Sequence, residues 1–504
     1  MEIKEFSPRN YQINISSICK DKNTLVCLPT GTGKTKIGIL TAMHRLNKFP
    51  ESKVIILTPT KPLAAQIYEE FKKNTTIKEE EIKLLTGSLS PSKRKETYNS
   101  SKIIVATPQT IQSDLDNERT TLKNVSLLIV DECHRSKENF ANTKVAKHYI
   151  SQSNYPRIIA LTASPGSSKE NINQICSNLN IEAIEIRTEN DEDLKEFIQK
   201  KEKDYVHVEF PEEFKKIHTI LKEVYNSKLE GVKSFGVLKP IGIINKTDLI
   251  LLQKRLQGEI KKQNASAFYG LFLVSYLLKL NYAMELIETQ SLQSLKEFFE
   301  KLQVDTSKAA KAILSDIKIK YAIKQTEELI SKDIKHPKLL KLIEIVSNEI
   351  LKNPKYKAIV FANYRTTVNQ IVNELNSLNM SSSKFVGQAD RQDKGLKQKE
   401  QIELINKFKN NEFNILVASS VAEEGIDIPE VNAVIFYETI GSELRKIQRT
   451  GRTGRTMPGK IIFLMTKGTR DIGYYFSSLN KEKKMKSTLN RMKGDTFTKY
   501  ENNS

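Results

Sequence analysis

Short apolar runs alternate with longer amphipathic segments in the first part of this 504-residue sequence. A run that is apolar throughout is typical of a strand buried on both faces, and an amphipathic segment between two such runs is typical of a helix that covers a sheet. We therefore predict a parallel-sheet domain over residues 1–186, with ligands bound at the carboxyl ends of its strands. The expected strands are residues 24–28, 54–57, 103–106, 127–130 and 158–161.

A different pattern fills residues 187–335. Apolar residues such as Leu271, Val274 and Leu277 recur at helical spacing, while Gly and Pro are sparse and Lys is frequent. This pattern predicts a mainly α-helical insert domain. Its most apolar stretch, residues 271–278, is too short to cross a bilayer, so we expect a buried helix and no membrane partner.

The alternation of apolar runs and amphipathic segments returns after His336-Pro337, where the residue before proline avoids the helical conformation. Residues 336–479 are therefore predicted as a second parallel-sheet domain, and residues 480–504 as a basic tail whose helix frays into disorder. The expected fold class is α/β, with two parallel-sheet domains and a mainly α-helical insert domain between them. The strands expected in the second domain are residues 358–361, 384–386, 415–418, 433–436 and 461–465.

Composition narrows the range of partners. Lys and Arg number 80 against 60 Asp and Glu, a formal net charge of +20. A surplus of this size favours a polyanionic partner, above all nucleic acid, although a generic lysine-rich surface would also account for it. The four cysteines form no Cys-x-x-Cys pair and the six histidines do not cluster with them, which favours reduced thiols over a zinc site.

A glycine-rich segment, residues 28–35, lies between the first expected strand and a helix expected at residues 36–46. Its glycines let the backbone curl, so that N–H groups and the helix N-terminus face a phosphate. Lys34 would reach the β- and γ-phosphates, and Thr35 would hold Mg²⁺. The general pattern begins with Gly where this chain has Leu28, and the alternative is a turn with no ligand. The expected phosphate-binding residues are Thr30, Gly31, Thr32, Gly33, Lys34 and Thr35.

A pair of carboxylates follows the expected strand at residues 127–130, within Asp131-Glu132-Cys133-His134. Asp131 would bind Mg²⁺ directly or through water, and Glu132 would polarise the water that attacks the γ-phosphate. The alternative is a solvated acidic turn, which the glycine-rich segment upstream makes a weaker explanation. Cys133 is expected to be a small packed residue.

The glycine-rich segment and Asp-Glu-Cys-His together resemble the DExH group of superfamily-2 helicases, and further motifs of that group follow in order. The resemblance implies ATP and Mg²⁺ as cofactors and two RecA-like domains. It assigns adenine recognition to Arg9 and Gln12, although an exposed polar N-terminus would explain these residues nearly as well. In the first domain it assigns nucleic-acid binding to Thr60, Lys61, Pro62, Gly87, Thr107 and Gln109, where small hydroxyls and exposed N–H groups hold a backbone without reading bases.

The resemblance extends into the second domain. It assigns nucleic-acid binding to Asn363, Tyr364, Gly387, Gln388 and Ser420, and contact with the ribose to Asp427. Motif VI, residues 448–455, reads Gln-Arg-Thr-Gly-Arg-Thr-Gly-Arg. By family analogy Gln448 lies beside the phosphate or the attacking water, and Arg452 and Arg455 are arginine fingers that neutralise γ-phosphate charge. A basic solvated loop is the alternative for motif VI in isolation.

The match is closer to the archaeal Hef helicases, which are related to the Fanconi-anaemia M-type fork remodellers. It rests on residues 60–63, 106–110, 161–166, 423–425, 452–459 and 467–471, and on residues 285–290 of the insert. In that family the insert resembles a polymerase thumb and helps engage branched DNA. Many members continue into a nuclease with Gly-Asp and Glu-Arg-Lys, but Gly494-Asp495 is followed by no Glu-Arg-Lys here, so we expect the helicase part without nuclease activity.

The resulting expectation is an ATP-dependent helicase or translocase that moves 3′ to 5′ on forks and Holliday-type junctions. Its partners would be branched and single-stranded DNA, with a sliding clamp or a nuclease acting in trans, and its location the cytoplasm at the nucleoid. Two alternatives stay open. One is an ATPase that depends on RNA or double-stranded RNA, and the other is a nucleic-acid-binding scaffold that uses ATP only to switch its grip.

Overall fold

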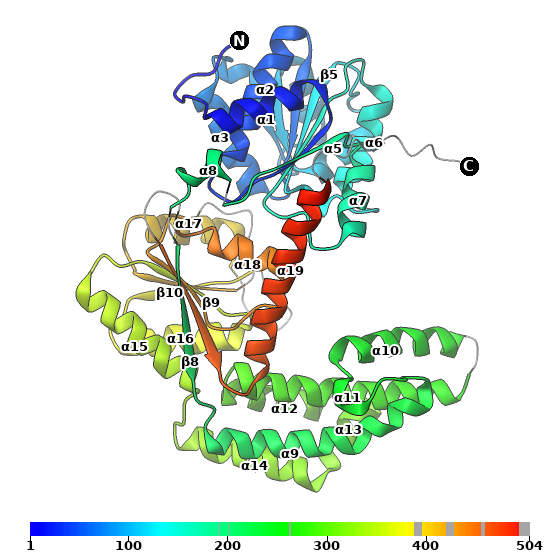
Figure 1. The fold of residues 1–504 in the computed structure, drawn as a ribbon, viewed down its shortest axis with the longest axis vertical. Helices are drawn as coiled ribbons and strands as arrows, with labels where there is room; N and C mark the ends of the chain where they lie inside the picture. Colours follow the sequence, from blue (N-terminus) through cyan, green and yellow to red (C-terminus); the bar gives the residue numbers. More distant parts are fainter. Residues whose placement is uncertain are drawn as a thin grey trace.

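The computed structural model describes residues 1–189, 191–199, 201–261, 264–387, 396–419, 428–454 and 459–492. It has a curved, elongated outline, in which two sheet domains occupy one limb and a helical bundle extends from the far end of the second (Figure 1). The expected α/β fold with a helical domain between two parallel-sheet domains is confirmed. We call these parts domain 1, the insert and domain 2.

Domain 1 is built on a parallel sheet with the strand order β3-β4-β2-β5-β6-β1-β7. Its central strands are buried along almost their whole length, as their uninterrupted apolar sequences require. Since the strands are parallel, their carboxyl ends meet at one edge of the sheet. The strands are β1 Thr24–Cys27, β2 Lys53–Leu57, β3 Ile82–Leu85, β4 Ile103–Ala106, β5 Val125–Asp131, β6 Ile158–Thr162 and β7 Ala183–Ile186.

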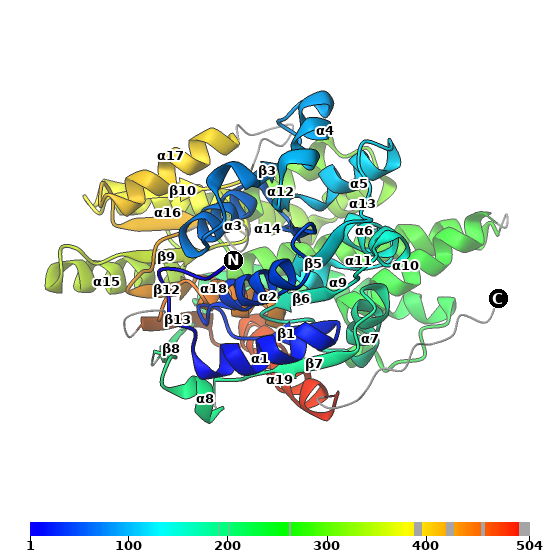
Figure 2. The same cartoon turned by 90° about the horizontal axis from the view of Figure 1, so that it is seen from above.

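Helices cover both faces of this sheet (Figure 2). Alternate residues of one strand serve opposite faces, so that Val26 packs with α1, α2 and α3 while Leu25 packs with α5, α6 and α7. The helices of domain 1 are α1 Asn10–Asp21, α2 Lys34–Lys48, α3 Lys61–Asn74, η1 Glu79–Glu81, α4 Pro91–Ser100, α5 Pro108–Asp116, η2 Cys133–Arg135, α6 Ala141–Gln152 and α7 Lys169–Asn178, followed by α8 Glu192–Lys195.

The insert is a bundle of helices around its own apolar core. Its central helix, α11, is long and apolar enough to cross a membrane by length and composition alone. In the bundle, however, α9, α10, α12 and α13 pack around it, and Val274, Leu277 and Leu280 lie in the core, which accounts for its composition. The helices are α9 Glu212–Leu229, η3 Glu230–Phe235, η4 Ile241–Ile243, α10 Lys246–Lys261, α11 Ser266–Thr289, α12 Leu292–Val304, α13 Lys308–Ser315 and α14 Ile317–Ser331.

Domain 2 has a parallel sheet with the strand order β10-β11-β9-β12-β13-β8. Helices α15 and α16 cover one face, and α17 covers the other together with α19. The strands are β9 Ala358–Phe361, β10 Ser382–Phe385, β11 Ile415–Ala418, β12 Ala433–Phe436 and β13 Gly459–Thr466, with β8 Lys201–Val208 at one edge. The helices are α15 Pro337–Lys352, α16 Arg365–Ser377, α17 Gln398–Lys409, α18 Glu443–Thr450 and α19 Arg470–Met492.

Strand β8 corrects the expected boundary at residue 187. It was predicted within the helical insert, yet it pairs with β13 from Gly459↔Lys201 to Thr466↔Val208 as the edge strand of domain 2. Its first four residues are charged and only its last residue, Val208, is buried, because an edge strand meets little of the core. The chain therefore adds a strand to domain 2 before it enters the insert.

Helix α19 corrects the expected basic tail from residue 480. The helix runs unbroken from Arg470 to Met492 and spans from the junction of domain 2 and the insert to domain 1 (Figure 1). Met485, Leu489 and Met492 are buried in the core of domain 1, and the Ser164 hydroxyl donates to Met485 Sδ at 2.9 Å. The predicted helix is therefore present, and these contacts hold it in place to Met492, where it was expected to fray. Residues 493–504 lie outside the described part of the chain.

Candidate functional site

The glycine-rich segment forms a tight loop between β1 and α2 at the carboxyl edge of the first sheet. Gly31 and Gly33 have φ of +81° and +76°, values at which a side chain would be strained. A Cβ atom at Gly33 would also lie 2.7 Å from Gln12 Nε2. The Lys34 ammonium donates to the carbonyl oxygens of Leu28 and Pro29 at 3.2 and 3.4 Å, which folds its side chain back across the loop.

Helix α1 holds this loop from the outside. The hydroxyl of Tyr11 and the amide of Gln12 both donate to the Thr32 carbonyl oxygen, at 2.5 and 3.3 Å. Gln12 Oε1 in turn accepts from the Arg9 backbone N–H at 3.0 Å, and the Arg9 guanidinium lies 4.2 Å from the centre of the Phe197 ring. The residues predicted to read adenine are thus brought to the phosphate loop, and Tyr11 between them also contacts it.

The two carboxylates stand at the end of β5. Glu132 has φ of +48°, and its Oε2 lies 3.3 Å from His134 Nδ1, an ion-pair distance. His134 Nδ1 is also 3.4 Å from Thr162 Oγ1, at the end of β6. Burial first, and the charge of Glu132 second, raise the pKa of Asp131 to about 7, while the Lys34 ammonium lowers it. Asp131, Glu132 and Lys34 therefore share one electrostatic environment.

These residues fit a nucleoside triphosphate with Mg²⁺. The two left-handed glycines leave room for phosphate oxygens where a side chain would intrude. Asp131 is half-buried at the end of β5, and a carboxylate with a raised pKa is the kind of oxygen ligand that a hard divalent cation stabilises in its charged form. Thr35 is partly buried in the first turn of α2, at the carboxyl edge of the sheet where Asp131 also lies. Cys133, by contrast, is buried in the core of domain 1, as expected.

Motif VI reaches this loop from domain 2. It begins on α18, where Gln448 is buried, and continues past Gly451 to Arg452, which is also buried. A Cβ atom at Gly451 would fall 2.2 Å from Thr30 Oγ1, so the backbone of motif VI lies directly against the phosphate loop. The structure therefore brings the predicted second half of the nucleotide site to the first across the interface between the domains.

The residues predicted to bind nucleic acid in domain 1 follow three neighbouring strands. Thr60 caps α3 after β2, Gly87 follows β3, and Thr107 caps α5 after β4. Since β3, β4 and β2 are adjacent, these residues share one half of the carboxyl edge, while β5, β6 and β1 carry the nucleotide residues. A Cβ atom at Gly87 would meet nothing within 4 Å, which leaves its backbone open to a ligand. Lys61, Pro62 and Gln109 lie in the first turns of the same helices.

In domain 2 the residues predicted to bind nucleic acid also lie together on one half of the sheet. Asn363 follows β9 and Gly387 follows β10, on the half of the sheet that also contains β11. Tyr364 lies differently from the expectation. Its ring packs against the insert, 5.9 Å from the Tyr282 ring, and its hydroxyl is 3.5 Å from Glu285 Oε1. That placement gives Tyr364 a role in joining domain 2 to the insert, and its contact with nucleic acid stays a prediction. Gln388, Ser420, Asp427 and Arg455 lie outside the described residues.

A cavity of about 930 Å³ lies between the insert and domain 2, away from the phosphate loop. Its walls include Glu297 and Lys301 of α12 and Arg365 and Asn369 of α16. None of the predicted nucleotide or nucleic-acid residues lines it. The predicted nucleotide site therefore consists of the loop and the carboxylates and lies away from this cavity.

Three family models match successive parts of the chain. The model described as DEAD/DEAH box helicase covers residues 10–172, and the helicase conserved C-terminal domain covers residues 337–457. The model described as "Putative ATP-dependent RNA helicase, helical bundle" covers residues 213–336, between the other two. The order of these models follows the order of domain 1, the insert and domain 2.

The chain is also similar to solved and curated proteins. The crystal structure of the Hef helicase domain of Pyrococcus furiosus is 41% identical and has a TM-score of 0.72, with 94% of this chain and 98% of that chain covered. A Methanocaldococcus jannaschii protein named "Putative ATP-dependent RNA helicase" is 41% identical over 97% of this chain. The Schizosaccharomyces pombe ATP-dependent DNA helicase fml1 is 32% identical over 92% of this chain. The chain spans 61% and 57% of the lengths of these two curated relatives.

Proposed function

Since this chain belongs to the family of the Hef helicase domain, we propose that it is an ATP-dependent DNA helicase and translocase of forks and Holliday-type junctions in replication-fork repair. The observation that carries the proposal is the approach of Gly451 to Thr30, which divides one nucleotide site between two domains. A site divided in this way forms when the domains close and separates when they open. Relative movement of the domains is the step that a translocase needs.

Each residue of the proposed nucleotide site has a separate role in hydrolysis. Bound ATP with Mg²⁺ supplies the phosphoanhydride whose hydrolysis drives the cycle. Lys34 and the loop N–H groups orient the phosphates, and Thr35 and Asp131 provide oxygen atoms for the cation. Glu132 orients the attacking water and accepts its proton, with His134 Nδ1 at 3.3 Å from its Oε2. Arg452, together with Arg455, neutralises charge from the side of domain 2.

Domain movement would act on nucleic acid through the two rows of residues at the carboxyl edges of the sheets. One row contains Thr60, Gly87 and Thr107, and the other contains Asn363 and Gly387. When the domains close, the distance between the rows shortens, and a strand held by both rows advances. We propose movement 3′ to 5′, a location at the nucleoid in the cytoplasm, and a sliding clamp or a nuclease in trans as protein partners.

One experiment distinguishes this proposal from its alternatives. ATPase activity is measured with forked DNA, linear duplex DNA and RNA, and strand displacement is followed on the fork. We expect the fork to stimulate hydrolysis most and to be unwound. Greatest stimulation by RNA would favour an RNA helicase, the activity in the name of the Methanocaldococcus jannaschii relative. Hydrolysis without displacement would favour a scaffold that ATP switches. Lys34→Ala and Glu132→Gln are expected to abolish stimulated hydrolysis, and persistent activity in Lys34→Ala would contradict the site.

A further inference from the structure

The turn that follows β6 lies between the phosphate loop after β1 and the carboxylate pair after β5, and we call its residues 162–164 the β6 turn. The Thr162 carbonyl oxygen accepts from the Leu28 backbone N–H, at the start of the phosphate loop, at 3.2 Å. The Thr162 hydroxyl donates its single hydrogen to the Ser164 carbonyl oxygen at 3.0 Å and accepts from the Ser164 backbone N–H at 3.1 Å. These bonds set the direction of the Thr162 hydroxyl.

The Thr162 hydroxyl lies beside the side chains that are expected to act on the attacking water. Its Oγ1 is 3.4 Å from His134 Nδ1, and the same nitrogen is 3.3 Å from Glu132 Oε2. Because the hydroxyl hydrogen points to the Ser164 carbonyl oxygen, the Thr162 oxygen can only accept from His134. A displacement of the β6 turn therefore changes the space and the hydrogen-bond acceptor that His134 has beside Glu132.

Helix α19 holds the other end of the β6 turn. The Ser164 hydroxyl donates to Met485 Sδ at 2.9 Å, and both side chains are enclosed, with exposed fractions of 0% and 3%. A thioether sulfur is a weak acceptor, but within the described part of the chain it is the acceptor that this hydroxyl has. If the sulfur is removed, the enclosed hydroxyl must turn or shift to find another partner. The position of Ser164 therefore depends on Met485.

The preceding turn of α19 contacts the helix on which motif VI begins. Glu482 Oε2 accepts from Lys446 Nζ at 3.0 Å, and the buried Lys446 ammonium also lies 5.7 Å from the centre of the Tyr475 ring. Lys446 belongs to α18, two residues before Gln448. Since Glu482 and Met485 are three residues apart on one helix, they are neighbours on its surface. One short segment of α19 therefore contacts both α18 of domain 2 and the β6 turn of domain 1.

We propose that Met485 is a positioning residue for ATP hydrolysis, because it holds the β6 turn whose Thr162 lies against His134 and Glu132. Met485 acts through Ser164 and not on the reacting atoms, and none of the predicted motifs includes it. The same segment of α19 seats α18 through Glu482, so the position of motif VI and the position of the β6 turn are set together. The inference rests on the proposed function, because it concerns the hydrolysis step assigned to Glu132.

The test exchanges methionine for leucine at two positions of α19 in the full chain, and ATPase activity is measured with saturating forked DNA. Met485→Leu keeps an apolar side chain of similar volume but removes the acceptor sulfur. Met492→Leu makes the same change in the same core, where the sulfur accepts no hydrogen bond from any described residue, and is the matched control. For Met485→Leu we expect kcat about fivefold lower, the factor that one neutral hydrogen bond represents, and KM for ATP within about twofold. For Met492→Leu we expect both values within about twofold.

Hydrogen exchange provides a measurement in the absence of nucleotide. The Ser164 backbone N–H donates to the Thr162 hydroxyl inside the β6 turn, so its exchange reports the order of that turn. We expect faster exchange of the Ser164 amide in Met485→Leu and unchanged exchange in Met492→Leu. Equal exchange in the two variants would mean that the sulfur does not hold the turn.

A double-variant cycle separates the hydrogen bond from general packing. Ser164→Ala removes the hydroxyl that needs the acceptor, so adding Met485→Leu to Ser164→Ala should change kcat by less than about twofold. Multiplying losses in the double variant, equal losses in Met485→Leu and Met492→Leu, or an unchanged kcat in Met485→Leu would each overturn the positioning role. Absent stimulation of hydrolysis by forked DNA in the unmodified chain would instead overturn the proposed function.

Discussion

At the level of single residues, the proposed nucleotide site depends on two positions whose surroundings limit what the residue can do. Gly451 is one, because the backbone there lies against the Thr30 side chain and has no room for a Cβ atom. Asp131 is the other, because burial and the neighbouring Glu132 raise its pKa to about 7, although the carboxyl of a cation ligand must be charged. Each position leads to a measurable consequence.

Gly451→Ala is expected to lower stimulated ATPase activity by about 100-fold, since an added methyl group displaces motif VI from the phosphate loop and a misplacement of about 1 Å can cost that factor. Steady-state ATP hydrolysis in the presence of forked DNA measures this loss of activity. Gly473→Ala on α19 is the matched control, because a Cβ atom there meets nothing within 4 Å. Equal activity of the two variants would mean that motif VI does not work in the closed arrangement.

The raised pKa of Asp131 predicts how the Mg²⁺ requirement depends on pH. Below about pH 7 the carboxyl becomes neutral and binds a cation poorly, so the Mg²⁺ concentration for half-maximal hydrolysis should rise as pH falls from 8 to 6. The Mg²⁺ concentration for half-maximal hydrolysis should change little above pH 8, where the Asp131 carboxyl is already charged. Mg²⁺ titrations of ATPase activity at fixed ATP test this expectation, and a requirement that is constant across the range would contradict it.

At the level of elements, α19 joins parts of the molecule that lie far apart in the sequence. Its first residue, Arg470, bonds to the insert, and Tyr475 packs in the core of domain 2. Met485 and Leu489 lie in the core of domain 1, and Ile447 of α18 packs against the same cluster. The helix therefore keeps domain 2 close to domain 1 while leaving the phosphate loop and motif VI to meet beside it.

Leu489→Ala is expected to cost about 2–5 kcal/mol of unfolding free energy in domain 1, because a completely buried leucine leaves a cavity when it is truncated. Limited proteolysis should cut α19 faster, since its last turns would detach more often. Ser487→Ala, on the exposed face of the same helix, is the control and should change neither measurement. Unchanged proteolysis in Leu489→Ala would show that α19 does not depend on its docking to domain 1.

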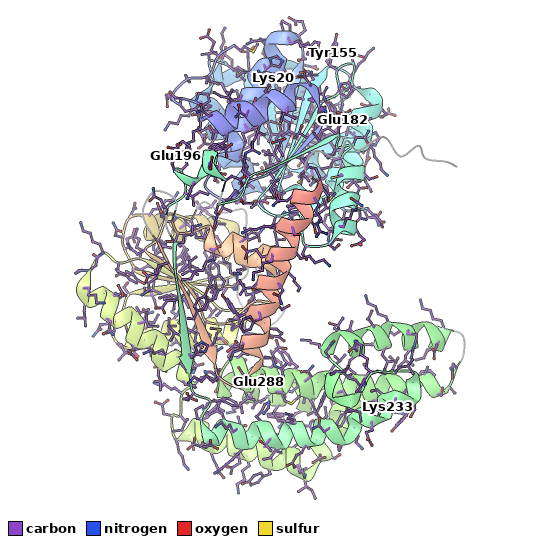
Figure 3. All side chains as sticks on the ribbon, viewed as in Figure 1. Lys20, Tyr155, Glu182, Glu196, Lys233 and Glu288 are labelled. Atoms are coloured by element: carbon purple, nitrogen blue, oxygen red, sulfur yellow. The ribbon has the colours of Figure 1, made fainter. Side chains whose placement is uncertain are left out.

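At the level of the whole molecule, the insert packs against domain 2, where α12 contacts α16 and α11 contacts α19. Glu288 stands at this junction, at the base of α19 (Figure 3). It accepts from His218 Nε2 at 2.9 Å and from the Arg470 backbone N–H and Nε, both at 2.9 Å. Burial raises the pKa of Glu288, but the hydrogen bonds from His218 and Arg470 and the Arg470 charge outweigh burial and hold it at about 2. The insert and domain 2 should therefore move as one body.

Glu288→Gln is expected to destabilise the junction by about 3–5 kcal/mol, because it removes the nearer of the two carboxylates that pair with the partly buried Arg470 charge and leaves only Glu285 at 3.7 Å. Hydrogen exchange at the ends of α9 and α11 and urea unfolding measure the loss. The exposed pair of Glu223 with Lys318 supplies the control, since Glu223→Gln should cost about 0–1 kcal/mol.

The contribution of Glu288 also has a definite pH dependence. A carboxyl whose pKa falls on folding stabilises the protein above its unfolded value, near 4.5, and loses that effect as pH falls towards about 2. The difference in stability between the unmodified chain and Glu288→Gln should therefore shrink from pH 5 to pH 2. A constant difference over that range would contradict the assignment.

Much of the fold and the chemistry follows from neighbouring residues. The strands at residues 103–106, 358–361, 415–418 and 433–436 end where their apolar runs end, because burial on both faces leaves no room for a polar residue. Two edge strands of domain 1, β3 and β7, were missed because they carry Lys83 and Glu185, since their outer sides meet little of the core. The edge strand β10 of domain 2 overlaps the strand predicted at residues 384–386. The phosphate loop and the carboxylate pair were predictable because each is a contiguous segment whose chemistry depends on local geometry.

Contacts between distant segments could not be predicted in this way. Periodicity shows that a face is buried but does not show which surface buries it. For that reason β8 was placed in the insert although it completes domain 2, and the last turns of α19 were expected to fray although they pack in the core of domain 1. The sequence therefore specified the two sheets, the helical bundle and the local half of the nucleotide site. Packing over long separations decided that motif VI meets Thr30 and that the insert belongs with domain 2.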